Sequence, residues 1–169
     1  TSEHKALVRA QSEALRRVLP ARVADDRPRF AALDLALSFD AWIFFHQIPR
    51  LSALAHQFPN VRIILNHCGG ILGACAYAGR RGDVFLHWRA AMSELANCPN
   101  VSVKIGGLGM AISGFGFEQL DQAPSSEALA RAWRPWVQTC IELFGANRCM
   151  FESNFPVDKG SYGYLVGWN

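Results

Sequence analysis

The segments PNVRIILNHCGG (59–70) and PNVSVKIGG (99–107) decide the fold. Each begins with Pro-Asn-Val, continues as a short apolar run and ends in glycines, and the second follows the first after about forty residues. Short apolar runs bounded by turn residues are typical of strands buried on both faces. The repeat therefore predicts strands over 61–67 and 101–105, at equivalent places in a repeating strand–helix architecture.

Residues with helical spacing occupy the intervals between these strands. Pro49 is predicted to open one helix, and Asp83 and Ser126 are predicted to cap two others. Pro135 is expected to kink or split the last of them, because proline lacks the N–H that a helix interior needs. Two further strands are predicted over residues 37–46 and 149–154. Four strands alternating with helices indicate an α/β fold with a parallel sheet.

Length and composition set limits on the organisation of the chain. The 169 residues are 50% hydrophobic, which suits one folded domain. Residues 1–29 are charged and mostly helical in pattern, so we expect an appended helix and loop there, with the main domain over 30–169. The net charge of +3 comes from 17 basic and 14 acidic residues scattered along the chain, which gives no support for a nucleic-acid partner.

The sequence also argues against membrane insertion and secretion. The longest apolar stretch, Ala31 to Phe45, is interrupted by Asp34 and Asp40, so no membrane helix is expected. The first residues lack the apolar core of a secretory signal. The five cysteines are odd in number, lack C-x-x-C spacing and are expected to be small core residues. We therefore expect a cytoplasmic protein.

Polar side chains follow each predicted strand. In parallel α/β folds, ligands bind at the carboxyl ends of the strands, so these side chains are the candidates for chemistry. They are His46 and Gln47 after the first strand, Asn66 and His67 after the second, Lys104 in the third, and Glu152 and Asn154 after the fourth. If the four strands are neighbours, these side chains converge.

His67 is the strongest candidate because it precedes Cys68-Gly69-Gly70, where glycine lets the backbone turn close to a ligand. It could be a metal ligand, a general base or a hydrogen-bond donor to a carbonyl oxygen, and the alternative is a hydrogen-bonded core histidine. Cys68 is not expected to be activated by it, since neighbours on a strand point to opposite faces. Lys104 needs either a carboxylate partner or a solvated cavity.

The glycine-rich run Gly106-Gly107-Leu108-Gly109 matches neither the dinucleotide nor the Walker pattern. We interpret it as a tight turn after the third strand.

Six short motifs follow one another along the chain: FDAWI (39–43), QIP (47–49), NHCGG (66–70), YAGRR (77–81), VKIGGLGM (103–110) and MFESNFPVDK (150–159). Together they resemble the amidohydrolase-related family, often called amidohydrolase 2, and its lactonase-like branch. The resemblance covers about residues 30–169. It implies a partial TIM-type (β/α) barrel, the C-terminal portion of a (β/α)8 barrel that takes about 250 residues when complete.

The resemblance also implies a reaction, the attack of water on a lactone or amide carbonyl at the strand ends. His67 falls where the family places a histidine that contacts the water, the metal or the substrate carbonyl, and Glu152 could act as the base. One divalent metal such as zinc is implied where an H-x-H pair is present. This chain has no H-x-H, and Asn154 replaces the family's aspartate. An amide cannot take up a proton and ligates metals poorly, so the sequence is compatible with one divalent metal or with none.

The remaining candidates complete this hypothesis. Lys104 is expected to counter substrate charge, Asn154 to orient the substrate, and His46 and Gln47 to contact it. The expected partner is a small-molecule substrate, with neither nucleic acid nor membrane. The alternative is a non-catalytic barrel fragment or pseudoenzyme that associates, also as a homo-oligomer, to complete the sheet, because a short parallel sheet leaves both edges open.

Overall fold

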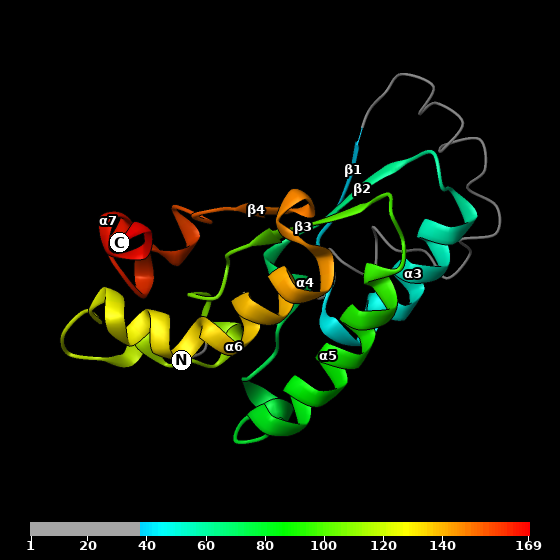
Figure 1. Ribbon diagram of the computed structural model, residues 1–169. Coiled ribbons are helices and arrows are strands. Elements are labelled where there is room, and N and C mark those ends of the chain that lie inside the picture. The colour runs from blue at the N-terminus through cyan, green and yellow to red at the C-terminus, as the bar shows by residue number, and fades with distance from the viewer. Residues whose placement is uncertain (1–37) are drawn as a thin grey trace. The chain divides into compact units, whose positions relative to one another are not determined.

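Four parallel strands form the centre of the computed structural model, which describes residues 38–169 (Figure 1). The sheet order follows the chain as β1-β2-β3-β4. The strands are β1 (Ser38–Ala41), β2 (Arg62–Leu65), β3 (Val101–Ile105) and β4 (Cys149–Phe151). All three neighbouring pairs are parallel, which confirms the predicted α/β class.

Three long helices connect the strands and lie together on one face of the sheet (Figure 1). They are α3 (Ile48–Gln57), α5 (Arg81–Ala96) and α6 (Ser126–Phe144). Two short segments carry the labels α4 (His67–Gly70) and α7 (Tyr164–Trp168). Single 3-10 turns lie at 45–47, 75–77, 111–113, 117–119, 146–148 and 157–160.

The core lies between the sheet and these helices. Alternate strand residues face the helices and are buried, namely Ala41, Ile63, Leu65, Val101, Val103 and Ile105. From the helix side, Trp88 of α5 and Trp136 of α6 pack with ring centroids 4.8 Å apart. Such an aromatic pair contributes about 0.5–1.5 kcal/mol beyond the area that it buries. Packing of the helices on one face therefore fixes which strand residues point to the other.

The opposite face of the sheet carries polar side chains. Asp40 on β1 pairs in register with Ile64 on β2, and Ile64 pairs with Ser102 on β3. Across β2, the Lys104 Nζ donates to Asp40 Oδ2 at 2.8 Å. Lys104 thus has the carboxylate partner that was one of the two expected solutions for a lysine in this strand.

The first predicted strand, 37–46, is wrong in its second half. β1 ends at Ala41, and residues 45–47 form a 3-10 turn. The Oε1 of Gln47 accepts the backbone N–H of Phe44 at 2.9 Å and closes this turn. Pro49 lies in the first turn of α3, as predicted. A side-chain hydrogen bond to the backbone ends the extended conformation here, despite the alternating apolar pattern.

β2 and β4 are also shorter than predicted. β2 stops at Leu65 and β4 at Phe151, whereas the predicted strands reached residues 67 and 154. His67 has φ of 55° and Asn154 has φ of 53°. Positive φ is incompatible with a strand, so both polar residues lie in turns beyond the sheet.

The helix starts differ slightly from the predictions. α5 begins at Arg81, and Asp83 lies in its first turn, 3.3 Å from the Arg80 guanidinium. Ser125, not Ser126, caps α6, and its Oγ accepts the Ala128 N–H at 3.3 Å. α6 continues through Pro135 as one helix.

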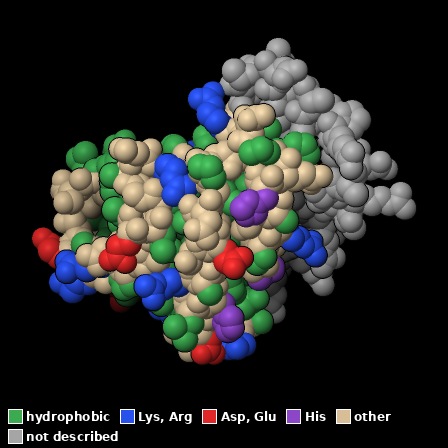
Figure 2. All heavy atoms as spheres, turned by 45° about the vertical axis from the view of Figure 1, so that its right-hand side comes forward, with side chains coloured by type: hydrophobic (Ala, Val, Ile, Leu, Met, Phe, Trp, Pro, Cys, Tyr) green, Lys and Arg blue, Asp and Glu red, His purple; other side chains and the backbone are tan. Residues whose placement is uncertain are grey.

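Residues 1–29 and their boundary with the main domain lie outside the described residues, so this division stays a prediction. In the part from Ser38 onward, no helix has the length and apolar character to cross a bilayer. Figure 2 shows basic and acidic side chains interspersed on the visible face of the described residues.

Candidate functional site

His67 lies in an unusual turn at the end of β2. The four residues His67, Cys68, Gly69 and Gly70 have φ of 55°, 51°, 77° and 65°, so α4 is a left-handed turn. This conformation costs non-glycine residues about 1–2 kcal/mol each. Trp88 Nε1 donates to the Cys68 carbonyl at 2.7 Å and helps to hold the turn. Strained backbone held by tertiary contacts is typical of functional sites.

The turn overturns the placement of Cys68 on a strand, whereas its expected role as a small core residue is confirmed. Cys68 does not lie on a strand, and its side chain is buried in the core instead of pointing to the opposite sheet face. Cys98 and Cys140 are buried as expected, but Cys75 is exposed. The neighbouring Cys68 thiol and burial raise the pKa of Cys140, which keeps it protonated.

Glu152 holds His67 from the end of β4. Its Oε1 lies 2.5 Å from His67 Nδ1 and also accepts the His67 backbone N–H at 3.0 Å. The side chains are 14% and 17% exposed, so the pair is largely shielded from water. His67 Nε2 has no hydrogen-bond partner among residues 38–169. Within the described part of the chain, the imidazole is therefore anchored through one nitrogen and free at the other.

Two glycines at the end of β3 make room for this pair. A Cβ on Gly107 would lie 2.6 Å from His67 Nδ1, and a Cβ on Gly106 would lie 2.5 Å from Glu152 Cγ. Gly107 also has φ of +67°. The predicted tight turn accounts for the positive φ of Gly107. The close approach of the backbone to His67 and Glu152 accounts for glycine at both positions, because a Cβ would not fit there.

Asp158, which was not among the predicted functional residues, is fully buried behind Asn154. Its Oδ1 accepts the Asn154 Nδ2–H at 2.7 Å, and its Oδ2 accepts the Gly109 N–H and the Tyr162 hydroxyl, both at 3.1 Å. Burial raises the pKa of Asp158, opposed by these three hydrogen bonds and by the charge of His67. Only its position four residues after Asn154 hinted at this contact.

Tyr162 and Gly109 complete the surroundings of Asp158. Burial and the negative charge of Asp158 raise the pKa of the Tyr162 phenol, so the hydroxyl remains a donor. A Cβ on Gly109 would lie 2.5 Å from Tyr162 Cε1 and 2.9 Å from Asp158 Oδ2. The run 106–109 thus lies against both the His67–Glu152 pair and Asp158.

Lys104, Gln47 and His46 have partners other than His67 and Glu152. Lys104 forms its ion pair with Asp40. Gln47 uses its side chain to close the turn at Phe44, and His46 is exposed and stacks on Phe44 with a centroid distance of 6.1 Å. Partial desolvation by neighbouring groups and, secondarily, the nearby Arg50 charge lower the pKa of His46.

Asn66 ends β2 immediately before His67. Its Oδ1 is buried and accepts no hydrogen bond from the described part of the chain.

These residues do not form a metal centre by themselves. Within residues 38–169, no three His, Cys, Asp or Glu side chains are placed to hold a metal ion. Glu152 occupies one imidazole nitrogen of His67, and Asn154 directs its amide nitrogen to Asp158. The described donor set therefore amounts to one free imidazole nitrogen and one amide oxygen, which does not fit a divalent metal.

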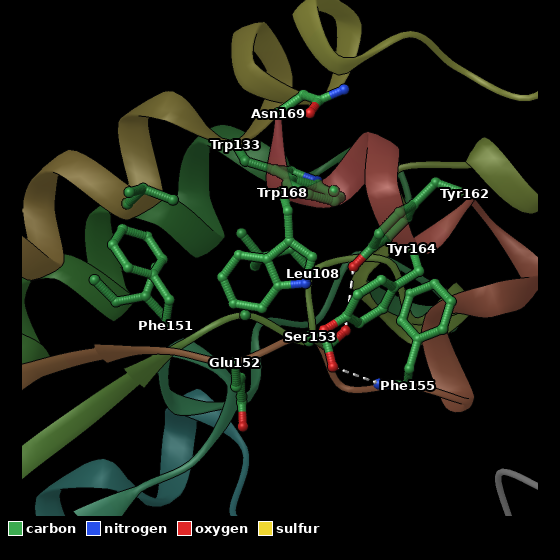
Figure 3. Close-up of a pocket in the computed structure, with 15 residues that line it drawn as sticks. Leu108, Trp133, Phe151, Glu152, Ser153, Phe155, Tyr162, Tyr164, Trp168 and Asn169 are labelled. Atoms are coloured by element: carbon green, nitrogen blue, oxygen red, sulfur yellow. Dashed lines mark hydrogen bonds between the residues drawn. The ribbon is translucent and has the colours of Figure 1, made fainter.

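A cavity of about 270 Å³ lies next to the site, between β4, α6 and α7. Its walls are mainly aromatic, with Trp133, Phe151, Phe155, Tyr162, Tyr164 and Trp168 among them. The carboxylate of Glu152 points away from this cavity (Figure 3). Glu152, Gly106 and Gly107 nevertheless form part of the cavity wall, so the cavity adjoins the His67–Glu152 pair.

Comparison with known proteins places this arrangement in a family. Over 133 residues, the chain is 39% identical to the uncharacterized protein y4mH of Sinorhizobium fredii, and the match covers 79% of this chain and 38% of that protein. It is 31% identical over 137 residues to an L-fucono-1,5-lactonase of Burkholderia ambifaria, covering 78% and 41%. The chain thus spans about two fifths of the length of these relatives.

The solved structures agree. A Burkholderia multivorans amidohydrolase with bound zinc superimposes with a TM-score of 0.65 at 25% identity, over 80% of this chain and 44% of that structure. This likeness confirms that the four-stranded sheet is part of a TIM-type barrel. The amidohydrolase family model, Amidohydro_2, matches residues 11–169. The chain therefore belongs to the amidohydrolase family, and its relatives place it in the lactonase-like branch.

Proposed function

We propose that the protein hydrolyses a lactone, with His67 as the general base. The observation that carries this proposal is the His67–Glu152 pair, anchored at 2.5 Å at the carboxyl ends of parallel strands. Active sites of TIM-type barrels lie at this end of the strands. The L-fucono-1,5-lactonase relatives make a sugar lactone the preferred substrate over an amide.

The chemistry follows from how Glu152 holds the imidazole. The Glu152 carboxylate accepts a hydrogen bond from Nδ1–H, so the lone pair of the neutral ring lies on Nε2. A water attacks the lactone carbonyl carbon and gives its proton to Nε2. The ring C–O bond then breaks, and the same proton passes to the leaving oxygen. One water and one lactone thus give one hydroxy acid, and His67 returns to its starting state.

The other predicted residues have binding roles in this proposal. Asn154, held by Asp158, orients the substrate. Lys104, His46 and Gln47 contact the substrate. Lys104 counters negative charge on the substrate while it also pairs with Asp40. The partner is a small molecule, and the proposed location is the cytoplasm.

Zinc has no step in this mechanism. The zinc-bound Burkholderia multivorans structure shows that a relative binds the ion. In this chain the donors described between residues 38 and 169 do not fit a metal site. The proposed steps therefore use only the chain's own groups.

A kinetic assay tests the proposal. The purified chain is mixed with L-fucono-1,5-lactone and other sugar lactones, and acid release is followed above spontaneous hydrolysis. We expect His67→Ala to lower kcat/KM by roughly 10²–10⁴-fold, the usual contribution of a general base. His87→Ala, which removes an exposed helix histidine, is the matched control. Equal rates for both variants would overturn the role of His67.

A second candidate function is association without catalysis. It is favoured by the edge strand β4, where Phe151 is 65% exposed and Met150 is 37% exposed. Apolar side chains on an open edge strand favour pairing with another chain or copy. Sedimentation velocity over a range of concentrations tests this: a monomer at every concentration contradicts self-association, and a dimer without lactone turnover favours it.

A further inference from the structure

We infer that Asp158 is a positioning residue that orients the Asn154 amide, so that the site presents the carbonyl oxygen of Asn154 instead of its NH2 group. The contacts themselves stand independently, whereas their importance for turnover rests on the proposed function. The consequence is a neutral acceptor, two residues beyond Glu152, for a substrate hydroxyl or the attacking water.

The orientation follows from the donors around Asp158. An ionised carboxylate only accepts hydrogen bonds, so the group of Asn154 that meets it must be the NH2 group. That contact is 2.7 Å long. The oxygen, on the opposite edge of the planar amide, is then directed away from Asp158 and accepts no hydrogen bond from residues 38–169.

Asp158 is itself held in one position. The Gly109 N–H and the Tyr162 hydroxyl both donate to Oδ2, which leaves Oδ1 for Asn154. The Ser161 hydroxyl donates to the Gly109 carbonyl and fixes the same backbone segment. Asn154 has φ of 53°, so its backbone also needs such tertiary support.

Asp158→Asn provides a sharp test because it should reverse the Asn154 amide. The Gly109 N–H can only donate, so the oxygen of the new amide must face Gly109. Its NH2 group then faces Asn154, which must turn its own oxygen inward and its NH2 group toward the site. The double variant N154D/D158N restores an acceptor oxygen at residue 154, because a carboxylate cannot donate.

The first readout is the side-chain amide of Asn154, since amide nitrogen and oxygen are hard to distinguish by diffraction. In the full chain labelled with ¹⁵N-asparagine, we expect one Asn154 Nδ2 proton to exchange with solvent roughly 10- to 100-fold more slowly than a free amide. Asn154→Asp identifies the signal by its loss. Free-amide exchange of both protons in the wild-type chain would overturn the inference without any variant.

The variants supply the second arm of this readout. In Asp158→Asn, the Asn154 protons should lose protection, whereas Ser161→Ala, a control for packing of the same segment, should leave it in place. Retained protection in Asp158→Asn would also overturn the inference. If Asp158→Asn fails to fold by near-ultraviolet circular dichroism, the wild-type exchange decides alone.

Turnover is measured separately with the lactones of the kinetic assay. We expect Asp158→Asn to lower kcat/KM by roughly 10- to 100-fold and N154D/D158N to recover part of that loss. A double variant no better than the single one, with Asn154 protected in the wild type, would refute the catalytic importance of the acceptor. Absence of turnover in the wild-type chain contradicts the proposed function, while the exchange result still decides the role of Asp158.

Discussion

His67 Nδ1 and Glu152 Oε1 lie 2.5 Å apart although 85 residues separate them in the chain. One residue follows β2 and the other follows β4, so β3 lies between their strands. The same Glu152 oxygen accepts the His67 backbone N–H at 3.0 Å. A single carboxylate oxygen thus positions both the backbone and the ring of the histidine.

Glu152→Gln should disturb the His67 tautomer. A glutamine can turn its NH2 group toward Nδ1 and so favour a proton on Nε2, where the proposed base needs its lone pair. We expect kcat/KM for lactone hydrolysis to fall by roughly 10- to 100-fold. The ¹⁵N shifts of the His67 ring show the tautomer directly. An Nδ1-protonated ring with reduced turnover would assign another role to Glu152.

Gly107→Ala should displace His67 and destabilise the fold. The new Cβ would lie 2.6 Å from His67 Nδ1, and φ of +67° adds strain. We expect a loss of about 2–4 kcal/mol of unfolding free energy in urea, from strain and overpacking together. Gly79→Ala is the matched control, because Gly79 has φ of +75° and a Cβ added there would meet nothing within 4 Å. Its expected loss is only about 1 kcal/mol.

Equal losses of unfolding free energy in Gly107→Ala and Gly79→Ala, with unchanged ¹⁵N shifts of the His67 ring, would contradict this prediction. The close approach of Gly107 to His67 would then make no contribution to stability.

Arg148 should be a major stabilising residue far from the site. Its guanidinium donates to the carbonyls of Ala96 and Cys98 at 2.9 Å, of Phe144 at 3.0 Å and of Val101 at 3.3 Å. Arg148→Ala removes all four of these hydrogen bonds, although the Cys98 oxygen still accepts the Val101 N–H, so we expect a loss of about 2–4 kcal/mol by urea unfolding. Arg148→Lys should recover part of this, since one ammonium cannot reach all four. A loss below about 0.5 kcal/mol in Arg148→Ala would contradict this role.

Asp158 should give stability a distinctive pH dependence. Burial raises its pKa in the folded state, so the folded chain binds the proton more tightly than the unfolded chain does. Its contribution is fully present below the ordinary aspartate pKa of about 3.9 and is lost as pH rises through the folded pKa. The stability of the wild type relative to Asp158→Asn should therefore fall as pH rises from about 4. Urea unfolding of both chains across this range measures it, and parallel pH curves would contradict it.

Sequence pattern predicted the architecture because strands and turns depend on local chemistry. The repeated Pro-Asn-Val units located β2 and β3, and the apolar alternation of β3 matches its burial. Pattern failed at the strand ends, where the Gln47 side chain bonds to the Phe44 backbone and where His67 and Asn154 take positive φ. Individual hydrogen bonds and packing contacts end these strands earlier than predicted. Such contacts involve single residues and therefore produce no periodic pattern in the sequence.

The sequence by itself determined the parallel strand–helix order, the family resemblance and the set of polar residues at the strand ends. Only the tertiary structure decided which of them meet: His67 with Glu152, Lys104 with Asp40, and Asn154 with the unpredicted Asp158. Residue type and spacing specify elements through contacts between near neighbours in the chain. Partners tens of residues apart are selected by strand register and close backbone approach, which exist only after the sheet has assembled.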